Sequence, residues 1–150
     1  MTMHSIHVST IGFTKSTAER FFERLLNANV KKLIDVRLNN TSQLAGFAKA
    51  EDLAYFLRKI GGIQYVHQPM FAPTADILDA YKKEKGDWSV YERQFTQLLE
   101  GRKIEERLRP DMFDGTCLLC SEATPHHCHR RLVCEYLNSK WGSPLKVLHL

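Results

Sequence analysis

One short segment of the chain concentrates groups that can attack or bind a substrate. It reads Cys128-His129-Arg130 and follows Pro125, which we expect to open a helix over 125–140. A thiol near the start of a helix feels the partial positive charge of that helix end, and the neighbouring histidine and arginine add to it. These influences favour the thiolate, so Cys128 is a candidate nucleophile with a pKa below that of a free thiol. The alternative is a buried cysteine that packs as a small hydrophobic side chain.

Two acid–base groups stand close to this thiol in the sequence. Glu122 and His129 are each able to move a proton for a nucleophile, and the predicted catalytic group is Cys128, Glu122 and His129. The alternative for His129 is a buried ring that is satisfied by a backbone carbonyl or by Glu122. The segment is not the Cys-x5-Arg phosphate loop of tyrosine phosphatases, because the residue six positions after Cys120 is His126.

The cysteines and histidines of this region also raise the question of a metal. Cys117-x2-Cys120 has the spacing of a zinc knuckle or a redox pair, but it lies on a predicted strand, where residues three apart face opposite sides. The cluster over 126–129 with Cys120 matches no known ligand spacing, and adjacent residues of a helix diverge in direction. The sequence therefore predicts neither a metal nor a cofactor.

A charged pair ends another predicted strand. Asp35 and Arg37 are two residues apart, so on a strand they point to the same side. One interpretation is a structural ion pair that locks the strand end. The other is a charged clamp in which Arg37 holds an anionic or polar group of a ligand.

Strand-like and helix-like segments alternate along the whole chain and must position these groups. Apolar, β-rich runs predict five strands, over 6–11, 32–37, 63–67, 116–120 and 145–148. Helical periodicity fills the intervals, with Ser16 and Thr74 as predicted N-caps. The alternation predicts one domain over 1–150, a three-layer α/β/α fold whose mostly parallel sheet is Rossmann-like or flavodoxin-like.

Ligands of an open parallel sheet bind outside the carboxyl ends of its strands. That rule selects a set of polar or small residues at the predicted strand ends: Thr10, Gly12, Asp35, Arg37, His67, Cys120 and Glu122. The set brings an anion, a cation, an imidazole and a thiol to one edge of the sheet.

These motifs resemble those of DUF488, a family of unknown function, over nearly all of the chain. The resemblance is carried by Thr10-Ile11-Gly12, Asp35-Val36-Arg37 with Ser42, Gly62-Ile63-Gln64-Tyr65 with Pro69, and the most specific motif, Glu122-x5-Cys-His-Arg. It implies the same α/β fold and a shared polar site. The chain departs from the family at Asn40, often a proline, and over 71–73, often Leu-Gly-Gly. With the strand-end rule, the resemblance predicts these substrate-binding residues: Thr10, Gly12, Asp35, Arg37, Ser42 and Arg130.

Two functions fit this predicted site. The first is a small cytoplasmic enzyme, a Cys/Glu/His-assisted hydrolase or transferase, that acts on an anionic substrate such as a nucleotide or a phosphorylated metabolite. The second is a module that binds a nucleotide or nucleic acid without catalysis, which requires a basic surface running from Arg130-Arg131 to the loop at 38–47. Acidic residues dilute the basic ones along the chain, which disfavours long contacts with nucleic acid. The oligomeric state stays open, a homodimer included.

Composition excludes several other classes of protein. The chain has 150 residues, of which 43% are hydrophobic and 25% are charged, as in one globular domain. Its net charge of +4 is scattered. No apolar run is long enough to cross a membrane, and the first residues lack the pattern of a secretory signal. All 4 cysteines fall within 117–134, which favours reduced thiols in the cytoplasm over a disulfide framework.

Overall fold

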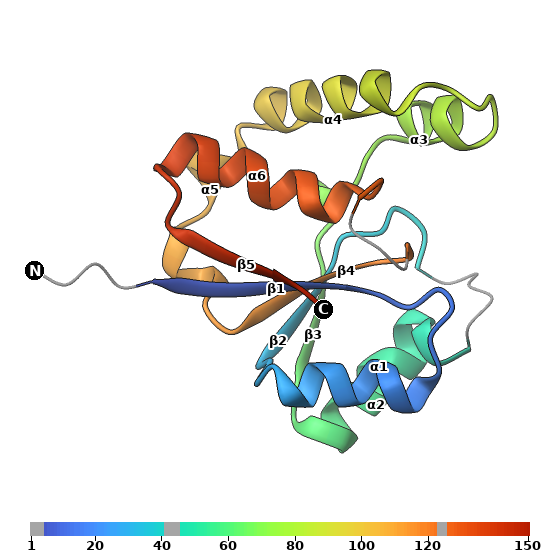
Figure 1. Ribbon diagram of the computed structural model, residues 1–150, viewed down its shortest axis with the longest axis vertical. Helices are drawn as coiled ribbons and strands as arrows, with labels where there is room; N and C mark the ends of the chain where they lie inside the picture. The colour runs from blue at the N-terminus through green and yellow to red at the C-terminus, as the bar shows by residue number, and fades with distance from the viewer. Residues whose placement is uncertain (1–4, 41–45, 123–125) are drawn as a thin grey trace, which may run out of the picture.

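A single five-stranded sheet organises the part of the chain that the structure describes, residues 5–40, 46–122 and 126–150. In this computed structural model the strands lie in the order β3-β2-β4-β1-β5, and all neighbouring pairs run parallel (Figure 1). The strands are β1 (Ile6–Gly12), β2 (Lys32–Asp35), β3 (Gln64–His67), β4 (Thr116–Cys120) and β5 (Leu145–His149). All five correspond to predicted strands, although β2 ends at Asp35, two residues earlier than expected.

Helices cover both faces of the sheet, so the predicted three-layer α/β/α fold is confirmed. On one face lie α1 (Ala18–Asn27) and α2 (Ala50–Gly61). On the other lie α3 (Ala75–Lys82), α4 (Trp88–Arg102), α5 (Ile104–Arg107) and α6 (His129–Trp141) (Figure 1). Short 3-10 turns occupy Gly46–Ala48, Pro69–Phe71 and Pro110–Phe113. Within the described ranges, no helix has the length and apolar character needed to cross a membrane.

The central strand β4 separates two hydrophobic clusters. All five of its residues are buried, as expected for a parallel strand covered on both faces. Cys117 and Leu119 belong to the cluster under α1 and α2, whereas Leu118 and Cys120 belong to the cluster under α4 and α6. The prediction that Cys117 and Cys120 face opposite sides of the sheet is therefore confirmed.

The strand order places the carboxyl end of β4 at a topological switch point. β4 lies between β1 and β2, an arrangement that differs from the usual orders of Rossmann and flavodoxin sheets. The chain leaves β1 and β2 toward α1 and α2, but it leaves β4 toward α6 on the opposite face. Connections that diverge in this way leave a crevice at the strand ends. Cys120, the last residue of β4, stands at that crevice.

The predicted start of α1 is wrong by one residue. Thr17, rather than Ser16, is the N-cap, and its hydroxyl accepts a hydrogen bond from the backbone N–H of Arg20 at 3.2 Å. The predicted cap of α3 is confirmed, because the Thr74 hydroxyl accepts from the N–H of Ile77 at 3.3 Å.

The predicted start of the last helix is also wrong. α6 begins at His129, and Cys128 is its N-cap residue with extended backbone angles, φ −138° and ψ 138°. Pro125, which was expected to open this helix, lies outside the described residues. A helix with its cap at Cys128 places that thiol before the first turn.

Gly12 allows the loop after β4 to pack against the end of β1. A Cβ added at Gly12 would lie 1.5 Å from the carbonyl oxygen of Glu122 and 2.9 Å from Nη1 of Arg130. These distances leave no room for a side chain at position 12. Glycine therefore allows the end of β1 and the loop after β4 to approach each other closely.

We therefore expect Gly12→Ala to lower the free energy of unfolding by about 3 kcal/mol, because the backbone at Glu122 must move. Gly101, near the end of α4, is the matched control, since a Cβ there meets no atom within 4 Å. Gly101→Ala should leave stability unchanged or raise it by about 0.5–1 kcal/mol. Urea unfolding of both variants checks the prediction, and equal effects would contradict the close approach.

Candidate functional site

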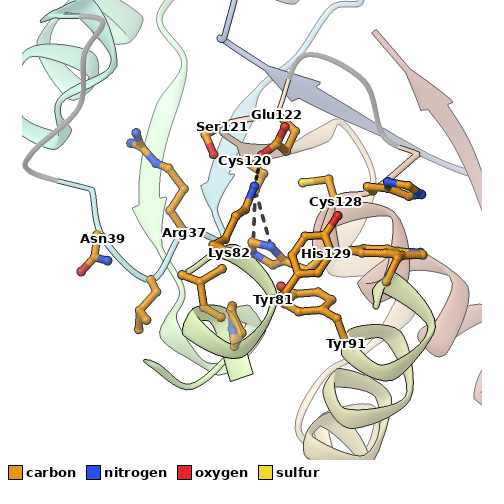
Figure 2. A pocket seen from close by; sticks show the side chains of 15 residues that line it. Arg37, Asn39, Tyr81, Lys82, Tyr91, Cys120, Ser121, Glu122, Cys128 and His129 are labelled. Atoms are coloured by element: carbon orange, nitrogen blue, oxygen red, sulfur yellow. Dashed lines mark hydrogen bonds and ion pairs between the residues drawn. The ribbon is translucent and has the colours of Figure 1, made fainter. Parts of the chain in front are cut away.

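A cavity of about 180 Å³ opens at the carboxyl end of β4. Cys120, Cys128 and His129 line its inner end, and all three are buried (Figure 2). Cys120 comes from the end of β4, and Cys128 and His129 from the start of α6. The switch point of the sheet thus holds two thiols and an imidazole.

The His129 ring is held by the backbone of the neighbouring strand connection. Its Nε2 lies 2.6 Å from the carbonyl oxygen of Val36, just after β2. A carbonyl oxygen only accepts, so Nε2 carries the proton and donates it. Nδ1 is then the ring nitrogen nearer to Cys120 Sγ, at 3.5 Å against 4.0 Å for Nε2. A nucleophile within reach of a base, with the base oriented by a third group, is the arrangement that activates catalytic thiols.

Charge on the Cys120 sulfur is favoured by its neighbours. The pKa of the Cys120 thiol is held well below its ordinary value because the neighbouring Cys128 thiol and the positive charge of His129 outweigh burial. Burial acts to lower the pKa of His129, but Cys120 and the Val36 carbonyl outweigh it and raise that pKa. Both shifts are in the direction that favours a thiolate–imidazolium pair.

Cys128 differs from the thiol expected from the sequence. It is only 2% exposed, and burial together with the neighbouring Cys120 raises its pKa well above the ordinary value. The expectation of a Cys128 thiol with a lowered pKa is therefore wrong. The physical reason is that His129 stands beside Cys120, which takes the negative charge and leaves Cys128 protonated.

Aromatic side chains of α3 and α4 form a wall of the cavity. Tyr81, Trp88 and Tyr91 line it, and Trp88 stacks on Tyr91 at 5.0 Å and on His127 at 4.9 Å between ring centroids. Burial raises the pKa of Tyr91, which stays a neutral phenol. The rings pack against one another along this wall.

An ion pair joins α3 to the loop after β4 beside the cavity. Lys82 Nζ pairs with the carboxylate of Glu122, and each side chain is about half exposed (Figure 2). The pair raises the pKa of Lys82, although burial acts in the opposite direction. Lys82 reaches the Glu122 carboxylate because α3 brings it over the loop.

Asp35 and Arg37 form the structural ion pair. Arg37 donates from Nε and Nη2 to the two oxygens of Asp35, at 2.9 and 2.7 Å, and from Nη2 to the carbonyl of Ala48 at 2.8 Å. The Tyr65 hydroxyl donates a hydrogen bond to a carboxylate oxygen of Asp35 at 2.6 Å. Arg37 lines the cavity, but its guanidinium points away from the thiols (Figure 2). The ion pair of the structural interpretation is therefore present, while Nη1 of Arg37 has no hydrogen-bond partner among the described residues, and the clamp role stays a prediction.

The other predicted substrate-binding residues lie outside the cavity lining. Thr10 is fully buried, and its hydroxyl lies 2.6 Å from Nδ1 of His149. Arg130 is fully buried and donates from Nη1 to the carbonyl oxygen of Glu122 at 2.6 Å. Gly12 makes the close approach described above. Ser42 lies outside the described residues.

The same inner group is able to hold a metal ion. The ligand atoms of Cys120, Cys128 and His129 lie within 4.8 Å of one another, and all three residues are buried. Two thiolates and an imidazole suit Zn²⁺, and a cavity on the fourth side resembles the open position of catalytic zinc sites. The hydrogen bond from Nε2 to Val36 is the outer contact typical of a ligating histidine.

The protein is thus an α/β protein with a Cys–His pair at the switch point of its sheet, and sequence comparison gives its family. The sequence model described as "Domain of unknown function DUF488" matches residues 17–137. The chain therefore belongs to this family, as its motifs predicted. No curated protein and no solved structure matches the chain.

The sequence correctly placed Cys120 at the carboxyl edge of the sheet but indicated no catalytic role for it. The signal for it was present, because the last residue of a buried central strand stands where ligands bind. Lys82 and Tyr81 were missed, since only the packing of α3 over the strand ends brings them to the cavity.

The buried ion pair yields a stability prediction. Asp35→Asn removes the charge that the buried Arg37 guanidinium faces, so we expect a loss of about 3–5 kcal/mol in the free energy of unfolding. Asp111 pairs with Arg109 on the surface, and Asp111→Asn should cost about 0–1 kcal/mol. Chemical denaturation measures both. A loss for Asp35→Asn as small as that of the control would show that the pair does not lock the strand end.

Proposed function

We propose that this protein is a small cytoplasmic thiol enzyme in which Cys120 is the nucleophile and His129 its acid–base partner. The observation that carries the proposal is the 3.5 Å approach of Cys120 Sγ to His129 Nδ1, with the other ring nitrogen bound to Val36. The four cysteines are free and buried, in keeping with a reducing compartment. The nucleophile thus moves from Cys128 to Cys120, and Cys128 becomes the hydrogen-bond donor to the attacking sulfur.

The chemistry follows from these positions. Cys120 Sγ attacks an electrophilic carbon of the substrate, and a covalent bond to sulfur forms as the bond to the leaving group breaks. His129 gives its Nδ1 proton to the leaving group. The neutral imidazole then takes a proton from water as the water oxygen bonds to the same carbon and the carbon–sulfur bond breaks. This step releases the product and restores the thiolate and the imidazolium in a hydrolase, and a transferase uses an acceptor hydroxyl or amine in place of water.

Lys82 supports an anionic substrate. Its ammonium group is about half exposed beside the cavity and is paired with Glu122. A phosphate or carboxylate group of a substrate would compete with Glu122 for this ammonium and free the carboxylate to act as a second acid–base group. This assigns to Lys82 the anion-binding role that the sequence gave to Arg37 and Arg130.

The nucleic-acid module fits the described surface less well. Arg130 is fully buried, and Arg131 pairs with Glu135 at 2.7 Å. The predicted basic surface was to start from these two residues. In the cavity wall, Trp88 is stacked on Tyr91 and on His127, so its ring faces are not free to stack on bases.

Alkylation of the thiols tests the nucleophile. The rate rises with pH as the thiolate forms and levels off above the pKa. Because the Cys120 pKa is lowered, its reaction with iodoacetamide should already be near its plateau at neutral pH, with a rate at pH 6.5 about tenfold or more above that of a free thiol. Cys117 and Cys134 serve as internal controls, since burial raises the pKa of each to about 12. Peptide mapping identifies the labelled residue.

A matched pair of histidine variants completes this test. His129→Gln removes the positive charge beside Cys120 and should shift its rate profile to higher pH. His67 also bonds a backbone carbonyl, that of Arg37 at 2.8 Å, but it does not line the cavity. His67→Gln should leave the profile in place. A Cys120 that is unreactive at neutral pH in the metal-free protein, or equal profiles for both variants, would overturn the proposal.

A zinc centre is the second candidate, favoured by the three converging ligand atoms. It predicts about one equivalent of zinc in the purified protein and slow alkylation that a chelator accelerates. Co²⁺ substitution should then give the visible bands of a tetrahedral thiolate site, which Cys120→Ser removes. Metal-free protein with fast alkylation and no such bands would exclude this candidate.

A further inference from the structure

The second thiol of the inner group has a partner within reach. The Cys128 and Cys120 sulfurs lie within 4.8 Å of each other beside His129. The two cysteines come from different elements, the end of β4 and the cap of α6. Cys117 lies in the hydrophobic cluster on the opposite face of β4. Cys134 is buried in α6, six residues after Cys128, and does not line the cavity.

We propose that Cys120 and Cys128 form a reversible disulfide when the protein meets a hydroperoxide, and that this modification switches the site off. The inference rests on the proposed function, because it requires Cys120 to be the reactive thiolate. It adds a modification site and a regulation to that function. A second thiol within reach of a reactive one, here within 4.8 Å, is the arrangement of a resolving cysteine.

The first step oxidises Cys120. Its sulfur attacks one oxygen of the hydroperoxide ROOH, so that an S–O bond forms and the O–O bond breaks. His129 supplies the proton that the departing RO⁻ requires, and the products are a sulfenic acid on Cys120 and the alcohol ROH. The sulfur has lost two electrons and the peroxide has gained them.

The second step involves Cys128. Its sulfur attacks the sulfur of the sulfenic acid, the S–O bond breaks, and the hydroxide leaves as water with the proton of the Cys128 thiol. In the net reaction, one thiolate, one thiol, one imidazolium and one hydroperoxide are consumed. The products are one disulfide, one neutral imidazole, one alcohol and one water molecule. A dithiol reductant reverses the change by thiol–disulfide exchange.

The disulfide has two consequences at the site. It removes the nucleophile, since Cys120 no longer carries a free sulfur. It also protects Cys120 from further oxidation to the irreversible sulfinic and sulfonic acids. The enzyme would therefore lose activity under oxidative conditions and recover it when a dithiol is supplied.

The experiment uses the full chain with Cys117→Ala and Cys134→Ala, so that two thiols remain. After a modest excess of hydrogen peroxide, the free thiols counted in denaturant should fall from two to none, and the intact mass should fall by about 2 Da. Dithiothreitol should restore both thiols. In the unsubstituted protein, digestion after Glu122 and after Arg130 separates the two cysteines, so a linked pair of peptides identifies the bond without any substitution.

The matched variant is Cys128→Ser. Cys120 then has no resolving thiol, and the same peroxide treatment should add about 32 Da as a sulfinic acid that dithiothreitol does not remove. Sulfinic acid on Cys120 in the unsubstituted protein, with Cys128 still open to alkylation, would overturn the inference and leave the thiol enzyme standing. A Cys120 that resists both peroxide and iodoacetamide would overturn the proposed function as well.

Discussion

The carbonyl oxygen of Val36 accepts a hydrogen bond from His129 Nε2, and this bond leaves Nδ1 as the ring nitrogen available to Cys120 Sγ at 3.5 Å. Without it the ring would be free to turn either nitrogen toward Cys120, and the protonation of the pair would not be set. The bond links the connection after β2 to the start of α6, across the end of β4. The strand order makes this link available, because β2 and β4 are neighbours in the sheet. The chemistry proposed for Cys120 therefore depends on sheet topology as much as on residue type.

The loop after β4 is held by contacts that do not themselves enter the cavity. Arg130 donates to the carbonyl of Glu122, and the N–H of Thr14 donates to the carbonyl of Ser121 at 3.0 Å. Gly12 has no side chain to push this loop away. The polar residues of the family motifs thus divide into two groups. Cys128 and His129 line the cavity, whereas Arg130 and Asp35 shape the backbone around it.

The sequence predicted the fold well because hydrophobic periodicity and the alternation of strands and helices reflect local burial. The site was predicted only in part. Cys128 drew attention through its neighbours in the sequence, but charge is favoured at Cys120, nine residues before His129, because a buried strand end and a helix start meet there. Arg37 looked like a ligand clamp, yet Asp35 and the carbonyl of Ala48 take its Nε and Nη2 donors, which leaves only Nη1 without a partner among the described residues. Such outcomes depend on tertiary distances, which residue types and spacing do not contain.

The central claim is that a thiolate on Cys120 and an imidazolium on His129 exist together near neutral pH. The ¹⁵N chemical shifts of the His129 ring measure it directly, with the signals assigned by their loss in a His129→Gln spectrum. We predict that both ring nitrogens are protonated at neutral pH in the unsubstituted, metal-free protein. In Cys120→Ser the negative partner is gone, and Nδ1 should lose its proton while Nε2 keeps the one bonded to Val36. A neutral His129 ring with the same tautomer in both proteins would contradict the account.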